Sequence, residues 1–290
     1  MKYVIGLDLG TTSISAVAID LSCNTLAVVN HTHEAAISST NDREAAQSTD
    51  RLLHGSQKSI REIVQLLECS PDAIGLTGQM HGFVCCDVSG AAISDFITWQ
   101  DKRVLAPADI ANETWLSSLQ KRLPENLHSR LGCQIRPGYA LATLDMLNGS
   151  RQLSENLHHV SDVTDWIGNQ LTNTPARIDP TFAASWGIYN LQQRSIDQEI
   201  IQTAGLNSKW FPALESNWKI RGTTSEQSGR NWHLPEGIPV LTGIGDHPAA
   251  VLATIENPES DLLMNVGTGG QIAWCTKNIL PTEELEVRPF

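Results

Sequence analysis

Asp246 is the residue of this chain whose setting most directly suggests acid–base chemistry. It lies in Gly243-Ile244-Gly245-Asp246-His247-Pro248, a glycine-rich turn that opens a predicted helix with a proline in its first turn. A carboxylate at such a turn can accept the proton of a hydroxyl that attacks a phosphoryl group. The spacing by itself favours a plainer role as the helix N-cap, and His247 is an alternative base. Asp246 is thus a candidate catalytic residue with a structural alternative.

A turn near the start of the chain has the composition of a phosphate-binding loop. Its sequence is Asp8-Leu9-Gly10-Thr11-Thr12-Ser13. Glycine lets the backbone approach a ligand closely, successive backbone N–H groups form an anion site, and the hydroxyls add donors. Asp8, at the end of the preceding strand, can hold Mg²⁺ directly or through water. The alternative is an ordinary hairpin turn.

A second turn, Gly267-Thr268-Gly269-Gly270, repeats this strand–Gly-Thr–strand pattern late in the chain. Two such turns facing each other across a cleft could clamp a polyphosphate, so the repetition favours phosphate binding. The motif Gly-x4-Gly-Lys-Ser/Thr is absent, and so is a Gly-x-Gly-x-x-Gly that follows a strand. The sequence therefore disfavours a P-loop enzyme and a dinucleotide-binding fold.

Two further runs have side chains that suit a sugar. In Gly78-Gln79-Met80-His81-Gly82, Gln and His offer hydrogen-bond donors and acceptors, and Met can lie against an apolar sugar face. In Trp99-Gln100-Asp101, the indole can stack on a sugar ring and the carboxylate can accept from its hydroxyls. Each run also has a structural alternative: a loop that satisfies itself in the first, and a core Trp with a helix-capping Asp in the second.

The elements that must position these residues follow from hydrophobic periodicity. Residues 3–20 read as strand, tight turn and strand, and a third strand near 25–30 completes an antiparallel meander. Three- and four-residue steps then predict a helix from Glu44 to Glu68. Two buried strands are expected at 73–77 and 83–86.

The second half of the chain is more helical. Residues 101–171 are predicted to be mostly helical with breaks at prolines, and the capping-box pattern Ser195-Ile196-Asp197-Gln198 predicts a helix that ends at Gly205. The turn-rich, polar stretch 220–239 suggests a domain boundary. Beyond it we expect a short strand at 240–242, the helix that Asp246 opens, and strands at 262–266 and 271–275.

Length and charge limit the class of protein. The chain has 290 residues, 41% of them hydrophobic, which suffices for a sizeable core and suggests two domains. It has 32 acidic and 20 basic residues, a net charge of −12, which argues against binding nucleic acid or anionic lipid by bulk charge. No apolar stretch is long enough to span a membrane, and no signal peptide or Cys-x-x-Cys pair occurs. We therefore expect a cytoplasmic protein.

Taken together and in order, these motifs resemble those of the FGGY carbohydrate kinases, within the actin/hexokinase/Hsp70-like ATPase superfamily. The resemblance extends over nearly the whole chain. The runs around Trp99 and Ala183-Ala184-Ser185-Trp186-Gly187 are most similar to sedoheptulokinase-like members. The matching motifs are 8–13 (first phosphate motif), 75–82 (sugar-side strand and loop), 99–103 (sugar site), Gly245-Asp246 (catalytic segment) and 267–269 (second phosphate motif).

The resemblance implies an α/β fold, with a ribonuclease-H-like first domain at 1–236 and the opening, incomplete part of a second, ATP-binding domain at 237–290. It implies ATP-dependent phosphorylation of a sugar or polyol hydroxyl, with a ketose such as sedoheptulose or xylulose as substrate and ATP and Mg²⁺ as cofactors. The sequence leaves the oligomeric state open, with a homodimer among the options. The implied roles are catalysis by Asp246; Mg²⁺ binding by Asp8 and Asp246; phosphate binding by Gly10, Thr11, Thr12, Ser13, Gly267, Thr268 and Gly269; and sugar binding by Gln79, Met80, His81, Trp99 and Asp101.

Two features depart from the family pattern. Gly269 stands where the second phosphate motif usually has serine, and the chain ends at Phe290 with no closing element for the second domain. The second feature suggests a fragment or truncated product, so a catalytically incomplete chain that binds sugar without turnover is the alternative function. An Hsp70- or actin-like ATPase is a third, weaker alternative, because it would not need the two sugar-site runs.

Overall fold

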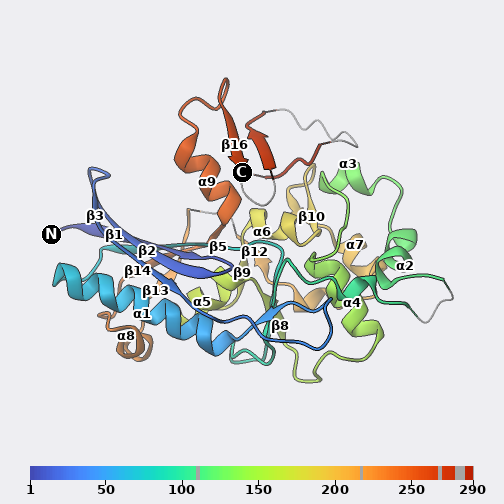
Figure 1. Ribbon diagram of the computed structural model, residues 1–290, viewed down its shortest axis with the longest axis horizontal. Coiled ribbons are helices and arrows are strands. Elements are labelled where there is room, and N and C mark those ends of the chain that lie inside the picture. The colour runs from blue at the N-terminus through green and yellow to red at the C-terminus, as the bar shows by residue number, and fades with distance from the viewer. Residues whose placement is uncertain (109–111, 216–217, 267–269, 278–284, 290) are drawn as a thin grey trace.

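A seven-stranded mixed β-sheet forms the centre of the described chain (Figure 1). The computed structural model describes residues 1–108, 112–215, 218–266, 270–277 and 285–289. The strands of the sheet are β1 (Tyr3–Leu9), β2 (Ser13–Asp20), β3 (Thr25–Thr32), β5 (Ala73–Gly78), β13 (Ile220–Thr223), β14 (Pro239–Leu241) and β15 (Ile244–Gly245). Their order is β13-β14-β5-β1-β2-β3, and β15 also pairs with β5.

The sheet has an antiparallel part and a parallel part. β1, β2 and β3 form the predicted antiparallel meander, while β5, β14 and β15 run parallel to β1 or to one another. Alternate residues of β1 are buried, which is the two-residue period of a strand with one face in a core. The α/β class predicted from the sequence is confirmed.

One face of the sheet is covered by α1 (Thr49–Leu67), α5 (Val163–Thr172) and α8 (Glu226–Trp232), which lie below it in Figure 1. α1 packs against β1, β2 and β3, and α5 packs against β5, β13 and β14. Their apolar side chains and those of the sheet form one hydrophobic core, which contains Leu7, Ile63 and Trp166.

The first helix is shorter than the predicted 44–68. Ser48 is its N-cap, with a side-chain oxygen that accepts from the Arg51 backbone N–H, and α1 begins at Thr49. The preceding residues form β4 (Ala46–Gln47), which pairs with β7 (Phe96–Ile97). The start of the helix was predicted wrongly because these residues fit the helical period while a strand further along the chain takes their hydrogen bonds.

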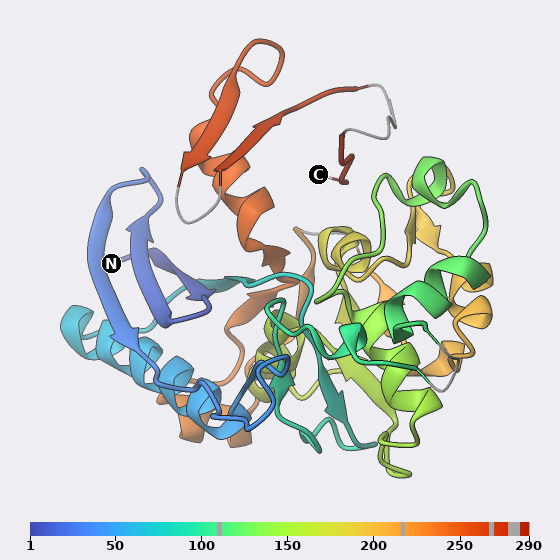
Figure 2. The ribbon, with the colours of Figure 1, turned by 45° about the vertical axis from the view of Figure 1, so that its right-hand side comes forward.

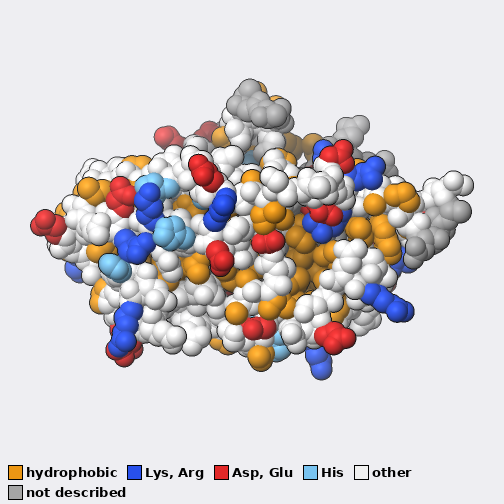
Figure 3. All heavy atoms as spheres, turned by 60° about the horizontal axis from the view of Figure 1, so that its bottom comes forward, with side chains coloured by type: hydrophobic (Ala, Val, Ile, Leu, Met, Phe, Trp, Pro, Cys, Tyr) orange, Lys and Arg blue, Asp and Glu red, His pale blue; other side chains and the backbone are white. Residues whose placement is uncertain are grey.

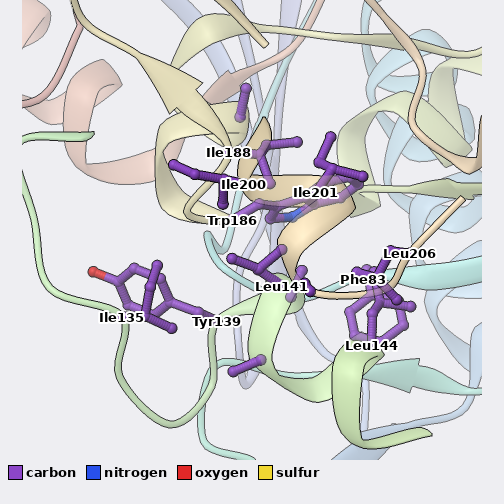
Figure 4. Packing of buried hydrophobic residues seen from close by; sticks show 14 of the residues in the cluster. Phe83, Ile135, Tyr139, Leu141, Leu144, Trp186, Ile188, Ile200, Ile201 and Leu206 are labelled. Atoms are coloured by element: carbon purple, nitrogen blue, oxygen red, sulfur yellow. The ribbon is translucent and has the colours of Figure 1, made fainter. Parts of the chain in front are cut away.

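A second hydrophobic core lies in a mainly helical part beside the sheet, and Figure 4 shows Phe83, Leu141 and Trp186 packed within it. Its helices are α2 (Trp115–Arg122), α3 (Leu127–Leu131), α4 (Ala140–Gly149), α6 (Pro180–Ser185) and α7 (Gln198–Thr203), with 3₁₀ helices η1 (Arg103–Leu105) and η2 (Ser208–Trp210). Its short strands are β6 (Val84–Cys86), β8 (His159–Ser161), β9 (Arg177–Ile178), β10 (Tyr189–Asn190), β11 (Ser195–Ile196) and β12 (Ala213–Leu214).

The predicted capping box at Ser195 is wrong. Ser195 lies in β11 and pairs with Asn190, and the N-cap of α7 is Asp197, whose carboxylate accepts from the Ile200 backbone N–H. Arg130 also binds the Asp197 carboxylate, with nitrogen–oxygen distances of 2.6–3.0 Å. This ion pair fixes Asp197 at the start of the helix, which the local pattern does not show.

The chain continues from the sheet into α9 (Asp246–Thr254) and a hairpin of β16 (Leu262–Val266) and β17 (Gly270–Trp274), which project beyond the sheet in Figures 1 and 2. The division into 1–236 and 237–290 stays a prediction. β14 and β15, however, lie beyond residue 236 and pair with β5 in the main sheet. The sheet therefore draws chain from both sides of the expected boundary.

Acidic and basic side chains are interspersed over the face of the molecule shown in Figure 3. Among the described residues, no helix combines the length and the apolar character needed to cross a membrane.

Candidate functional site

Three parallel strands end at the same edge of the sheet and bring together motifs that are far apart in the sequence. In the register, Leu9 at the end of β1 and Gly245 at the end of β15 both pair with Gly78 at the end of β5. The phosphate turn, the run that starts at Gln79 and the helix that starts at Asp246 therefore leave the sheet side by side. The carboxyl ends of parallel strands are the usual place for ligands in open α/β sheets.

The carboxylates of Asp8 and Asp246 lie close enough at this edge for their charges to interact. Burial, and then the charge of Asp246, raise the pKa of Asp8 to about 6. Burial likewise raises the pKa of Asp246 above its ordinary value. The Oδ1 atom of Asp8 is shielded from solvent and has no hydrogen-bond partner among the described residues. Two adjacent carboxylates with an unsatisfied oxygen fit a hard divalent cation such as Mg²⁺, which proteins bind through one or two carboxylates.

Asp246 is not the helix N-cap that its spacing allowed. Gly245 occupies the N-cap position without a side-chain bond, and Asp246 is the first helical residue. One carboxylate oxygen of Asp246 accepts from the backbone N–H of His247 at 2.7 Å. A Cβ on Gly245 would lie 2.7 Å from the sulfur of Met80. Met80, a predicted sugar-binding residue, thus lies beside the residue that precedes Asp246.

Two buried amide side chains stabilise the first phosphate turn by hydrogen bonds to its backbone. Gln47 donates to the carbonyl of Thr11 at 2.7 Å, and Gln79 donates to Gln47 at 2.8 Å and to the carbonyl of Gly10 at 3.4 Å. The Gly10 N–H donates to the Ser13 carbonyl at 3.1 Å, which closes the turn. Gln79 is 1% exposed, so the structure places it as a support of the turn, and a direct sugar contact stays a prediction.

His81 lies on the opposite side of this edge, against the mainly helical part. Its Nδ1 lies 2.7 Å from the carbonyl oxygen of Ser185, and its backbone N–H donates to the Ser185 hydroxyl. Because a carbonyl only accepts, Nδ1 carries the proton, and Nε2 of the neutral ring is an acceptor. The ring centroid lies 4.7 Å from that of Tyr139. In Figure 4 the Tyr139 hydroxyl points away from the other labelled side chains.

The two predicted residues of the Trp99-Gln100-Asp101 run have separate surroundings. Trp99 is 47% exposed, not in the core, and its indole N–H donates to the Thr11 hydroxyl at 3.0 Å. Asp101 is fully buried, accepts two bonds from the Arg103 guanidinium at 2.8 and 2.9 Å, and accepts from the Ala45 N–H. Trp99 therefore joins the phosphate turn, whereas Asp101 acts within the fold and its sugar contact stays a prediction.

The predicted second phosphate motif, Gly267, Thr268 and Gly269, lies outside the residues that the structure describes. Sequence reasoning missed Gln47, which it placed in a helix, and also Tyr139. The structure connects Tyr139 to the sugar-site run, because a Cβ on the preceding Gly138, which has a φ of +85°, would lie 2.1 Å from the Trp99 carbonyl oxygen.

The buried state of His81 predicts an acid-sensitive fold. Burial, and then the charge of Arg288, lower the pKa of His81 from 6.5 to about 4. Between these values the unfolded chain binds a proton that the folded chain does not, so the free energy of unfolding falls as the pH falls through this interval. We expect the free energy of unfolding of His81→Asn to fall by about 3 kcal/mol less than that of the wild type between pH 7 and pH 4. Asn can replace the Nδ1 donor of the histidine, and it tolerates the φ of +71° at this position.

Urea unfolding at both pH values measures this difference. The matched control is His54→Asn, at an exposed histidine of α1, which should keep the wild-type pH dependence. Equal acid losses in His81→Asn and the wild type would contradict the assignment.

Comparisons with known proteins add the following. A family model described as "FGGY family of carbohydrate kinases, N-terminal domain" matches residues 3–253. The chain is 25% identical to the sedoheptulokinase of Mus musculus over 298 residues, covering 93% of this chain and 58% of that protein. It is 24% identical to a xylulose kinase of Staphylococcus epidermidis, covering 93% and 52%. The chain thus spans about half the length of the curated relatives it matches.

Solved structures share the fold. The xylulose kinase from Rhodospirillum rubrum superposes with a TM-score of 0.83 at 23% identity, covering 93% of this chain and 54% of that one. The gluconate kinase from Lactobacillus acidophilus has a TM-score of 0.80 at 20% identity, covering 93% and 53%. At these identities the likeness describes the fold.

Proposed function

Because the chain belongs to the FGGY family of carbohydrate kinases, we propose that it takes part in the ATP-dependent phosphorylation of a sugar or polyol hydroxyl. The observation that carries this proposal is that two carboxylates whose charges interact, Asp8 and Asp246, lie at the sheet edge that also holds the phosphate turn and the run from Gln79 to His81. Phosphoryl transfer needs a proton acceptor, charge neutralisation and positioning in one place, and this edge offers residues for each.

In this proposal Asp246 accepts the proton of the attacking hydroxyl. Burial raises the pKa of Asp246, which makes its carboxylate a better proton acceptor. Asp8, with its unsatisfied oxygen, and Asp246 would hold Mg²⁺. When bound, the cation neutralises charge on the phosphates of ATP.

The remaining residues bind and orient. The turn Gly10, Thr11, Thr12 and Ser13 would bind phosphate, together with Gly267, Thr268 and Gly269 from the second motif. Met80, His81 and Trp99 would contact the sugar, since Met80 lies beside Gly245 and Trp99 is open to solvent. For Gln79 and Asp101 the proposal is indirect, because both are buried and hydrogen-bonded within the fold.

The substrate proposed is a ketose such as sedoheptulose or xylulose. The reason is that a sedoheptulokinase and a xylulose kinase are relatives whose alignments cover 93% of this chain. Placement of the first domain within 1–236, a homodimer and a cytoplasmic location are parts of the proposal that rest on the sequence alone.

Release of ADP by this chain with Mg-ATP and a panel of ketoses and polyols tests the proposal. We expect release that depends on one sugar and disappears in Asp246→Ala. Asp261→Ala, at an exposed carboxylate beyond α9, is the matched control and should keep the wild-type rate. A folded protein that binds a sugar without releasing ADP would instead support the catalytically incomplete alternative. Absence of both release and sugar binding would contradict the proposal.

A further inference from the structure

The short segment 285–289 returns to the mainly helical part and packs against the residues around Gly132. Figure 2 shows this segment in dark red, near the end marked C. The Val287 backbone N–H donates to the Gly132 carbonyl at 2.8 Å, and the Val287 side chain packs on the second core. A Cβ on Gly132 would lie 2.4 Å from the Val287 carbonyl oxygen. The segment is therefore fixed by backbone and side-chain contacts.

These contacts place Arg288 against Tyr139. One guanidinium nitrogen, Nη2, donates to the Tyr139 hydroxyl at 2.7 Å and to the Glu286 carboxylate at 2.9 Å. The guanidinium carbon lies 5.7 Å from the centroid of the Tyr139 ring, within cation–π range. The other nitrogen, Nη1, is shielded from solvent and has no hydrogen-bond partner among the described residues.

Arg288 lies in one cluster with His81. Both side chains contact the Tyr139 ring: the His81 ring centroid lies 4.7 Å from that of Tyr139, and the Arg288 guanidinium carbon lies 5.7 Å from it. The charge of Arg288 is also one cause of the lowered pKa of His81. The unused Nη1 donor thus belongs to the same cluster as a residue proposed to hold the sugar.

The chemistry of these neighbours suits a hydroxyl. A hydroxyl both donates and accepts, Nη1 of Arg288 only donates, and Nε2 of neutral His81 accepts. A ligand with adjacent hydroxyls can therefore satisfy both groups at once. A buried donor without a partner is unfavourable in the free protein, so a ligand that supplies the acceptor binds more tightly than one that does not.

We propose that Arg288 is a substrate-binding residue whose Nη1 donates to a hydroxyl oxygen of the sugar or polyol. This inference rests on the proposed function and extends it, because it adds a residue that selects substrates by one hydroxyl. Sites that hydrogen-bond a substrate hydroxyl discriminate strongly against analogues that lack it.

Calorimetric binding of sedoheptulose, xylulose and their monodeoxy analogues, without ATP, tests this role. We expect Arg288→Gln to raise the Kd of the preferred sugar at least tenfold and to leave the Kd of one deoxy analogue unchanged. Arg288→Lys, which keeps the charge but lacks the planar fork, should show the same selective loss. Arg136→Gln is the control, because Arg136 approaches the same Glu286 at 3.6 Å but is 61% exposed; its Kd values should match the wild type. Thermal unfolding confirms that each variant is folded.

The outcomes separate this inference from the proposed function. Unchanged sugar binding in folded Arg288→Gln would overturn the role of Arg288 and leave the proposed function intact. Equal weakening for the parent sugar and every deoxy analogue would also overturn it, because a structural role predicts that pattern. A wild-type chain that binds none of these sugars would overturn both.

Discussion

Asp246→Asn is expected to lower kcat for sugar-dependent ADP release by about 10²- to 10⁴-fold, the usual contribution of a general base. The substitution keeps the size of the side chain and the acceptor oxygen for the His247 N–H, which lies 2.7 Å from the carboxylate. It removes the ability to take a proton, which the proposed mechanism needs from this residue in addition to its role in holding Mg²⁺. Sugar affinity should therefore stay within a few-fold of the wild type.

Asp8→Asn separates this role from that of a metal ligand. The charge of Asp8 interacts with that of Asp246, and Oδ1 of Asp8 is shielded from solvent without a hydrogen-bond partner among the described residues. A variant that has lost a cation ligand should regain part of its rate as the Mg²⁺ concentration rises, by mass action. Loss of a general base should not respond to Mg²⁺.

The measurement is kcat for the wild type and both variants across a Mg²⁺ series, with sugar binding by calorimetry in parallel. Near-normal turnover in Asp246→Asn would show that another group accepts the proton. Rescue of Asp246→Asn by Mg²⁺, to the same extent as Asp8→Asn, would assign Asp246 to the metal alone.

Residues that lie at the ends of strands could be predicted from the sequence. Asp8 lies near the end of a short apolar strand, and the run from Gln79 to His81 and Asp246 each follow a strand. A glycine lies within two residues of each, and both signals are local. Parallel pairing of β1, β5 and β15 then brings them to one edge without any further information. The topology of the site is a consequence of the strand order in the sheet.

Contacts between distant segments could not be predicted. Gln47 binds the Thr11 carbonyl from 36 positions away, and Arg288 binds Tyr139 from 149 positions away. Neither residue has neighbours that mark it. Asp101 is a related case, because its carboxylate looks available in the sequence but is paired with Arg103 two residues later. Partners of this kind depend on tertiary packing, whereas caps, turns and strand ends depend on a few adjacent residues.

Arg221→Met is expected to lower the free energy of unfolding by about 3–5 kcal/mol, the usual cost of leaving one member of a buried ion pair alone. Arg221 lies in β13, inside the stretch 220–239 that reads as a linker in the sequence. Its side chain is 1% exposed, and its Nη1 donates to the Asp165 carboxylate at 2.7 Å and to the Asp165 carbonyl at 2.8 Å. The pair joins β13 to α5.

A second substitution tests the cause. Asp165→Asn in the Arg221→Met background removes the unpaired charge, so it should restore more than half of the loss. The control is Arg230→Met in α8, whose pair with Glu226 is exposed at 76% and 72% and should contribute no more than about 1 kcal/mol. Urea unfolding gives each value, and the melting temperature of Arg221→Met should fall by on the order of 10 °C.

The shape of the transition decides how the linker-like stretch should be understood. Because β13 and β14 pair with each other and β14 pairs with β5, loss of Arg221 should destabilise the whole sheet in one cooperative step. That result would place residues up to β15 in the first folding unit and move any domain boundary beyond it. A loss below about 1 kcal/mol, or an early separate transition for 220–245 with the rest unchanged, would instead mean that the stretch behaves as the linker its composition suggests.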